Sequence, residues 1–178
     1  MNKIILVTGG ARSGKSAFAE KLSEQVAKKA YIATAQIFDE EMAHRIKLHK
    51  MRRGDSWQTF ESPFSAENAI NEAAKSHNLI LFDCLTVYLS NIICQFEQLE
   101  DISAINAAVN ESVNRLIEAA RNFTGTIIFV TNEVGSGIVP ENKLARIFRD
   151  CAGFANQTFA NAADEVYLLV SGISLKIK

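Results

Sequence analysis

Residues 9–16 read Gly9-Gly10-Ala11-Arg12-Ser13-Gly14-Lys15-Ser16, which matches the phosphate-binding P-loop pattern G-x-x-x-x-G-K-S. The apolar run Ile4–Val7 precedes this stretch and the helix-like segment Ala17–Leu22 follows it. A strand before the loop and a helix after it favour a phosphate site over a glycine-rich turn that only joins two elements. We therefore expect the eight residues to bind nucleotide, with Lys15 at the β- and γ-phosphates and Ser16 on Mg²⁺.

The rest of the chain alternates between strand-like and helix-like segments, which predicts an α/β fold with a mostly parallel sheet flanked by helices. The turn Ser171-Gly172 predicts that the last strand is antiparallel at the sheet edge. The expected strands are Lys3–Val7, Tyr31–Ala33, Trp57–Phe60, Leu79–Phe82, Thr126–Thr131, Val166–Val170 and Ser174–Ile177.

Two long helices have a clear apolar face. One is expected over Ile102–Asn122, and the other is expected to begin at Pro140, which suits a first helical position. The second helix carries an apolar stripe that we expect to lie in the core; it consists of Leu144, Ile147, Phe148, Cys151, Ala152, Ala155 and Phe159.

Length, composition and charge favour a single-domain protein that acts on a small molecule. The 178 residues are 48% hydrophobic, and no linker or repeat interrupts them, so we expect one nucleotide-binding domain over residues 1–178. The formal net charge is −1 and basic and acidic residues are interspersed, so the sequence shows no electrostatic footprint for nucleic acid or anionic membrane and favours a small-molecule substrate. The apolar run before residue 9 is too short for a signal peptide or a membrane span, which predicts a cytoplasmic protein.

Cysteines and histidines show no metal-ligand spacing. Cys84, Cys94 and Cys151 form no C-x-x-C pair, so we expect them to be buried as small hydrophobic residues. A metal is then expected to be Mg²⁺ that arrives with the nucleotide, and no tightly bound organic cofactor is expected.

Asp83 closes the apolar run Leu79–Phe82. It would lie at the carboxyl end of a buried strand, where open α/β sheets bind ligands. This placement favours a Walker B aspartate that binds Mg²⁺ beside Ser16. The alternative is an aspartate that caps a helix starting near Leu85.

A basic segment, Asp39–Arg53, has helical character and contains two histidines. At about 100° per residue, His49 shares a face with Arg45 and Arg53, whereas His44 points away from that face. The arginines would bind phosphate oxygens and lower the pKa of His49, keeping it neutral and nucleophilic. A basic, solvated helix face is the alternative.

Several longer strings resemble one family: GGARSGKS, YIATAQIFDEEMAHRI, WQTFES, VTNEVGSGIVPENKLARIFRDCAGFANQ and ADEVYLLVSGISLKIK. These blocks resemble the bifunctional adenosylcobinamide kinase / adenosylcobinamide-phosphate guanylyltransferases of cobalamin biosynthesis, and they extend from the first strand to the last residue. The resemblance implies a RecA-like P-loop domain. It also implies a homo-oligomer, a trimer by analogy.

The family's activity implies two reactions. A nucleoside triphosphate, ATP or GTP, phosphorylates the aminopropanol hydroxyl of adenosylcobinamide. A histidine then takes GMP from GTP and passes it to the cobinamide phosphate, giving adenosylcobinamide-GDP. The R-I-x-x-H pattern ending at His49 makes this residue the implied nucleophile. Some relatives have two adjacent histidines here, whereas this chain has Leu48 before His49.

The resemblance also implies further nucleotide contacts. Besides the P-loop and Asp83, the implied residues are Ala33, Thr34, Ala35, Lys50, Met51, Arg52, Arg53 and Glu61. We expect the polar end Thr131-Asn132-Glu133 of the fifth strand, with the loop that follows it, to face the same cleft. Glu133 would act as a base for the corrinoid hydroxyl, or it would contact a group that itself binds Mg²⁺. The alternative is that its loop has only a structural role.

Two other functions are open on sequence grounds. A simple small-molecule kinase without nucleotidyl transfer would not need His49 and its arginines. A nucleotide-gated regulatory protein would need a partner-binding segment, and the sequence contains no basic tail or extra domain that suggests one.

Overall fold

The computed structural model describes residues 2–36, 40 and 56–178. In chain order, its elements are β1 (Lys3–Gly9), α1 (Lys15–Leu22), β2 (Lys29–Ala33), β3 (Trp57–Glu61), α3 (Ala66–Ala73), β4 (Leu79–Asp83), α4 (Leu85–Ile93), α5 (Ile102–Asn122), β5 (Thr126–Val130), α6 (Lys143–Ala162), β6 (Glu165–Val170) and β7 (Ile173–Lys176).

The strands form one seven-stranded sheet in the order β3-β2-β4-β5-β1-β6-β7. All neighbours are parallel except β6 and β7, which pair antiparallel at the edge. The central strands β4, β5 and β1 carry uninterrupted apolar runs because both of their faces are covered. The predicted α/β class, with its mostly parallel sheet and antiparallel last strand, is confirmed.

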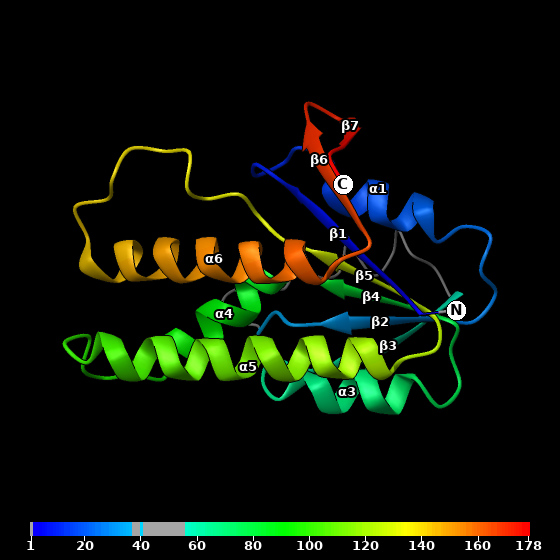
Figure 1. Ribbon diagram of the computed structural model, residues 1–178, viewed down its shortest axis with the longest axis horizontal. Coiled ribbons are helices and arrows are strands. Elements are labelled where there is room, and N and C mark those ends of the chain that lie inside the picture. The colour runs from blue at the N-terminus through cyan, green and yellow to red at the C-terminus, as the bar shows by residue number, and fades with distance from the viewer. Residues whose placement is uncertain (1, 37–39, 41–55) are drawn as a thin grey trace.

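Of the helices in the described part of the chain, α1 lies on one face of the sheet and α3, α4, α5 and α6 lie on the other (Figure 1). Ile4 and Leu6 of β1 join a large core with α3, α4, α5 and α6, whereas Ile5 and Val7 pack on the other face with α1. This alternation follows from the two-residue period of a strand. The strands that lead to the P-loop and to Asp83 are therefore buried on both sides, which holds their carboxyl ends in fixed positions.

Most expected boundaries shift by one to three residues. The helix α5 has the expected bounds, but α6 begins at Lys143 and not at Pro140. The Asn142 side chain accepts a hydrogen bond from the Ala145 N–H at 2.9 Å, so this asparagine is the N-cap of the helix. Strand β5 ends at Val130, one residue before its expected end.

The cysteines differ in exposure. Cys151 is buried, as expected, but Cys84 is half-buried and Cys94 is exposed. The prediction for Cys94 is wrong: this residue is the C-cap of α4, just after the last helical residue, and its side chain is exposed.

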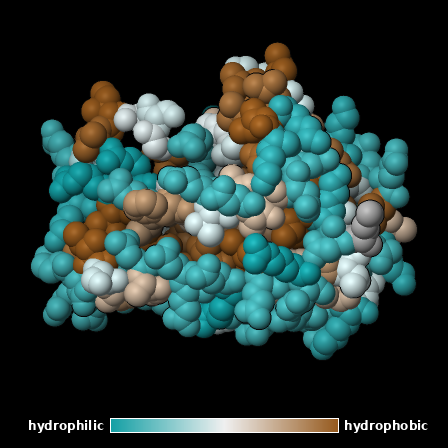
Figure 2. Space-filling model, in the orientation of Figure 1, coloured by the Kyte–Doolittle hydropathy of each residue, from teal (hydrophilic) through white to brown (hydrophobic). Residues whose placement is uncertain are grey.

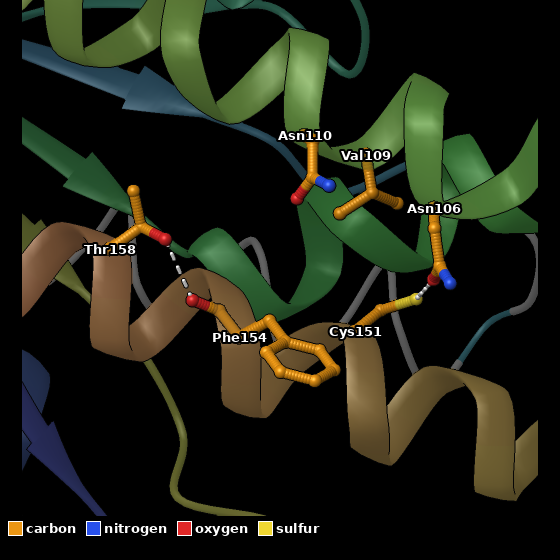
Figure 3. A pocket seen from close by; sticks show the side chains of 6 residues that line it. All are labelled: Asn106, Val109, Asn110, Cys151, Phe154 and Thr158. Carbon is orange, nitrogen blue, oxygen red and sulfur yellow. Dashed lines mark hydrogen bonds between the residues drawn. The ribbon is translucent and has the colours of Figure 1, made fainter. Parts of the chain in front are cut away.

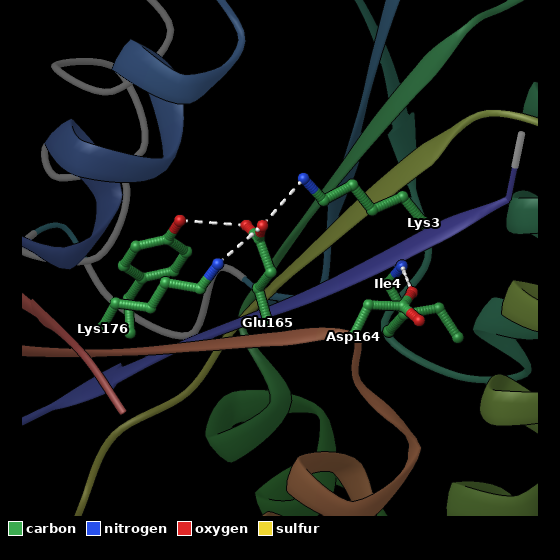
Figure 4. Close-up of polar contacts among 6 residues, drawn as sticks. Lys3, Ile4, Asp164, Glu165 and Lys176 are labelled. Atoms are coloured by element: carbon green, nitrogen blue, oxygen red, sulfur yellow. Dashed lines mark hydrogen bonds and ion pairs between the residues drawn. The ribbon is translucent and has the colours of Figure 1, made fainter. Parts of the chain in front are cut away.

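Ion pairs between charged side chains link the β6–β7 hairpin to β1. Figure 4 shows Glu165 between Lys3 of β1 and Lys176 of β7, with nitrogen–oxygen distances of 3.0 and 2.9 Å. The neighbouring Asp164 accepts a hydrogen bond from the Ile4 N–H at 2.7 Å. These contacts fix the start of β6 beside β1, and so place the hairpin turn next to the P-loop.

Apolar side chains lie at several places on the face drawn in Figure 2. Figure 2 shows hydrophobic side chains gathered over β6 and β7 and in the furrow between α5 and α6. The exposed residues of the hairpin and the strand end beyond it are Val170, Ile173, Leu175 and Ile177. Across residues 2–36, 40 and 56–178, no helix is long and apolar enough to cross a membrane.

Candidate active site

The P-loop connects β1 to α1 in a tightly turned conformation. Gly9 has a φ of 147°, and a Cβ atom there would lie 2.4 Å from the carbonyl oxygen of Leu169, so this position requires glycine. The Ser13 N–H donates to the Gly10 carbonyl at 3.2 Å, and the first intrahelical bond of α1 is accepted by Gly14. The N-terminus of α1 therefore opens directly onto the loop, as anion binding requires.

Lys15 is the cation of this loop. Its side chain is buried, and Nζ donates a hydrogen bond to the Gly10 carbonyl at 2.6 Å. Burial lowers the pKa of Lys15, while Cys84 and Asp83 oppose that shift. Burial also raises the pKa of the Cys84 thiol to about 11, with Asp83 adding to the effect. The Asp83 carboxylate beside Lys15 therefore opposes the lowering of the Lys15 pKa by burial.

Ser16 and Asp83, the two expected Mg²⁺ ligands, lie together. Ser16 Oγ donates to Asp83 Oδ2 at 3.0 Å, and the hydroxyl of Tyr31 donates to the same oxygen at 3.1 Å. A serine hydroxyl beside an aspartate carboxylate is a set of hard oxygen ligands, which fits Mg²⁺. Asp83 does not cap α4, because the N-cap position is Cys84 and no side-chain cap bond is present.

The segment after β2 is tied to the turn after β4. Thr34 is buried, and its Oγ1 donates to the Cys84 carbonyl at 3.0 Å and accepts from the Cys84 N–H at 2.9 Å. Asn91 Nδ2 donates to the Thr34 carbonyl at 2.8 Å. The Thr34 hydroxyl thus fixes the relative position of two strand ends. Ala33 and Ala35 flank it and are half-buried.

Glu61 lies at the same edge of the sheet, farther from the P-loop. It ends β3 and is exposed, and its register partner is Ala33, which in turn pairs with Asp83. The carboxyl ends of β3, β2 and β4 therefore lie at the same level of the sheet. His44, His49, Lys50, Met51, Arg52 and Arg53 lie outside the described residues.

Glu133 follows the end of β5 and is exposed. Its N–H donates to the Gly9 carbonyl at 3.0 Å, and its Oε1 accepts from the Gly135 N–H at 2.9 Å. One carboxylate oxygen therefore shapes the loop, which supports the structural alternative; a role in proton transfer stays a prediction.

Sequence reasoning missed several polar residues that the fold brings to this edge. Tyr31 reaches Asp83 from β2, and Asn91 reaches Thr34 from α4. Thr86, two residues after Cys84, accepts a hydrogen bond from Asn132. No local pattern marks these residues, because each contact joins segments far apart in the chain.

A pocket of about 320 Å³ lies elsewhere, between α5 and α6 (Figure 3). Asn106 accepts a hydrogen bond from the Cys151 thiol at 3.4 Å there, and Val109 and Phe154 supply apolar walls. This lining has no charged side chain and no P-loop residue, so it does not suit a nucleotide.

Comparisons with known proteins show which family this chain is similar to. The family model described as "Cobinamide kinase / cobinamide phosphate guanyltransferase" matches residues 5–177. The bifunctional adenosylcobalamin biosynthesis proteins CobU of Escherichia coli (strain K12) and Salmonella typhimurium (strain LT2) are 43% and 45% identical to this chain, over 98% of it and 99% of their own length. CobP of Pseudomonas aeruginosa, which has the same description, is 37% identical over 97% of this chain and 96% of its own length.

Proposed function

The chain belongs to the cobinamide kinase / cobinamide phosphate guanyltransferase family, and from this membership we propose a two-step reaction in adenosylcobalamin biosynthesis. The protein phosphorylates adenosylcobinamide with ATP or GTP and then transfers GMP from GTP to the product. The supporting observation is the hydrogen bond of 3.0 Å between Ser16 Oγ and Asp83 Oδ2 at the mouth of the P-loop. It joins the loop that binds phosphate to the carboxylate that binds its metal.

In the kinase step, an oxygen of the substrate alcohol forms a bond to the terminal phosphorus, and the bond from that phosphorus to the bridging oxygen breaks. The P-loop N–H groups bind the phosphates, and Lys15 neutralises the negative charge that develops there. Ser16 and Asp83 would hold Mg²⁺, which screens the charge of the β- and γ-phosphates. The alcohol proton leaves to solvent or to a nearby base.

In the guanylyl step, an imidazole nitrogen of His49 attacks the α-phosphorus of GTP and pyrophosphate leaves. A phosphate oxygen of adenosylcobinamide phosphate then attacks the same phosphorus, and the phosphorus–nitrogen bond breaks to release the histidine. Arg45 and Arg53 would bind phosphate oxygens and keep His49 neutral. These assignments rest on the sequence pattern around His49.

Further nucleotide contacts are part of the proposal. The backbone of Ala33, Thr34 and Ala35, the side chain of Glu61, and residues 50–53 would surround the base and ribose. The level arrangement of Ala33, Glu61 and Asp83 supports this, because ligands of parallel sheets bind along the carboxyl edge.

We also infer a homo-oligomer, a trimer by resemblance. The alternate positions Ile173, Leu175 and Ile177, at and just beyond the edge strand β7, are exposed, which supports a contact between copies of the chain. Light scattering of the purified protein should give a mass three times that of one chain. A monomeric mass at assay concentration would contradict this.

The two reactions are tested separately. Purified protein is incubated with adenosylcobinamide and γ-labelled ATP or GTP, and the corrinoid product is tested for label. A second incubation uses α-labelled GTP and Mg²⁺ and tests for label on the protein that is acid-labile and base-stable, as a phosphoramidate is. Transfer of γ-label without labelled protein would support a kinase that lacks the second step. Neither transfer would contradict the proposed function.

A further inference from the structure

Asn132 follows the strand that separates the two halves of the phosphate site. In the sheet, β5 lies between β1, which leads to the P-loop, and β4, which ends in Asp83. Val130 is the register partner of both Val7 and Asp83. The residues just after Val130 therefore emerge between the P-loop and the Asp83 carboxylate, at the level where the transferred phosphate must bind.

The backbone on both sides of Asn132 is attached to the P-loop strand. The N–H of Thr131 donates to the Val7 carbonyl at 3.0 Å, and the N–H of Glu133 donates to the Gly9 carbonyl at 3.0 Å. Gly9 is the first residue of the P-loop. These two bonds hold the backbone at Asn132 beside the start of the P-loop.

The side chain of Asn132 reaches in the opposite direction, to the turn after β4. Its Nδ2 donates to Thr86 Oγ1 at 2.9 Å, and that hydroxyl lies 3.1 Å from the Cys84 sulfur. Thr86 is buried and belongs to the first turn of α4, three residues after Asp83. The Asn132 amide therefore bridges the P-loop strand and the Asp83 turn.

A second asparagine, Asn156 of α6, makes hydrogen bonds with both Thr131 and Asn132. Thr131 is fully buried, and its Oγ1 donates to Asn156 Oδ1 at 2.7 Å. Asn156 Nδ2 donates in turn to the backbone carbonyl of Asn132 at 3.2 Å. This network holds the backbone at positions 131 and 132. The hydrogen bond to Thr86 orients the side-chain amide of Asn132.

The amide keeps unused hydrogen-bonding capacity. Among the described residues, its side-chain hydrogen bonds use one of two N–H groups and leave the carbonyl oxygen Oδ1 open. Asn132 is half-buried, so part of it faces the cleft. A neutral amide can bind an alcohol beside a triphosphate without the repulsion that a carboxylate would add. Glu133, by contrast, is exposed and uses one oxygen to shape its loop.

We propose that the Asn132 amide binds the acceptor hydroxyl and holds it in line with the terminal phosphate, and that Asn156 positions Asn132. The inference rests on the proposed kinase reaction and names a residue for it. The transition state of phosphoryl transfer is loose, so placement of the alcohol contributes more than early removal of its proton. An asparagine, which cannot act as a base, suits this task.

The test compares Asn132→Ala and the isosteric Asn132→Asp with Asn110→Ala, an exposed asparagine of α5 that serves as the control. Both Asn132 variants should lower kcat for phosphate transfer to adenosylcobinamide by about 100-fold. The KM for the nucleotide and the rate of GMP labelling of the protein should stay near wild type, because neither involves the acceptor hydroxyl. The ratio of nucleotide hydrolysis to phosphate transfer should rise, since water replaces a poorly held alcohol.

Asn156→Ala should show the same pattern more weakly, because Asn132 remains but loses one support. Kinase kcat within about fivefold of wild type in Asn132→Ala would overturn the inference. Equal losses of kinase activity, GMP labelling and nucleotide affinity would also overturn it, because they indicate a structural role only. A wild-type protein that transfers no phosphate to adenosylcobinamide overturns the proposed function, and this inference with it; an active wild type with unimpaired variants overturns this inference alone.

Discussion

The N–H of Gly172 donates a hydrogen bond of 2.9 Å to the carbonyl oxygen of Ser13. The turn of the last hairpin therefore rests on the P-loop. A Cβ atom on Gly14 would lie 3.3 Å from the Gly172 Cα atom, so the two backbones are in close contact. The C-terminal hairpin supports the phosphate site although the P-loop lies near the other end of the chain.

Gly172→Ala tests this support. Gly172 has a φ of 84°, and Ser171 before it has a φ of 52°, so the turn needs two left-handed residues. A side chain at position 172 should cost about 1–2 kcal/mol, which corresponds to a lower Tm by about 2–8 °C, and should weaken nucleotide binding. Thermal unfolding and a nucleotide titration measure the two effects. Gly137→Ala is the control, because an added Cβ meets no neighbour at either glycine but only Gly172 has a positive φ. Unchanged nucleotide affinity in Gly172→Ala would show that the hairpin does not support the P-loop.

Lys15→Ala should reduce phosphate transfer by at least about 10²–10³-fold, because it removes the buried cation of the P-loop. The initial rate with adenosylcobinamide and saturating nucleotide measures the loss. Lys21→Ala changes an exposed lysine in the same helix and should leave the rate near wild type. Circular dichroism checks that both variants are folded. A Lys15→Ala rate within about tenfold of wild type would contradict the role given to this lysine.

His49→Ala should abolish the GMP label on the protein and the formation of adenosylcobinamide-GDP while it leaves kinase turnover. Phosphoryl transfer needs positioning and charge stabilisation but no protein nucleophile, whereas the guanylyl step needs the imidazole. His44→Ala and His77→Ala should both keep the label. His77 is engaged elsewhere, since its Nδ1 lies 3.0 Å from the Ala73 carbonyl oxygen. A label that persists in His49→Ala would place the nucleophile at another residue.

Glu165 should make the fold sensitive to acid. Hydrogen bonds from Lys176 and Lys3 lower the pKa of Glu165 from 4.5 to about 2. A carboxyl whose pKa is lowered by folding stabilises the fold fully above its ordinary pKa, and this contribution is lost as the pH falls from about 4.5 towards about 2. Glu165→Gln should therefore be less stable than wild type at pH 7, and the difference should shrink in this acidic range.

Urea unfolding at several pH values between 3 and 7 measures the effect of Glu165→Gln. Glu24→Gln, an exposed carboxylate of the turn after α1, is the comparison variant. A difference between wild type and Glu165→Gln that stays constant with pH would show that the two lysines do not act through the charge of Glu165.

Local sequence determined which strands, loops and helices form the site, but it did not determine which of these elements lie side by side. The P-loop lies between β1 and α1 because glycines, an apolar run before them and a helical segment after them all act within a few residues. Asp83 ends β4 because an apolar run is followed by a charge. Helix α5 follows from its 3.6-residue period. The start of α6 was missed because the capping asparagine, Asn142, outweighs the proline preference at position 140.

Only the tertiary structure decided which of these elements meet. The hydrogen bond from Tyr31 to Asp83 requires β2 beside β4, and the bond from Asn132 to Thr86 requires β5 beside β4. Strand order depends on the packing of the whole sheet and its helices, and no local period encodes it. His49 lies outside the described residues, and its role stays a prediction. The sequence by itself thus identified the phosphate loop and its partner aspartate, whereas long-range packing placed Gly172, Tyr31 and Asn132 around them.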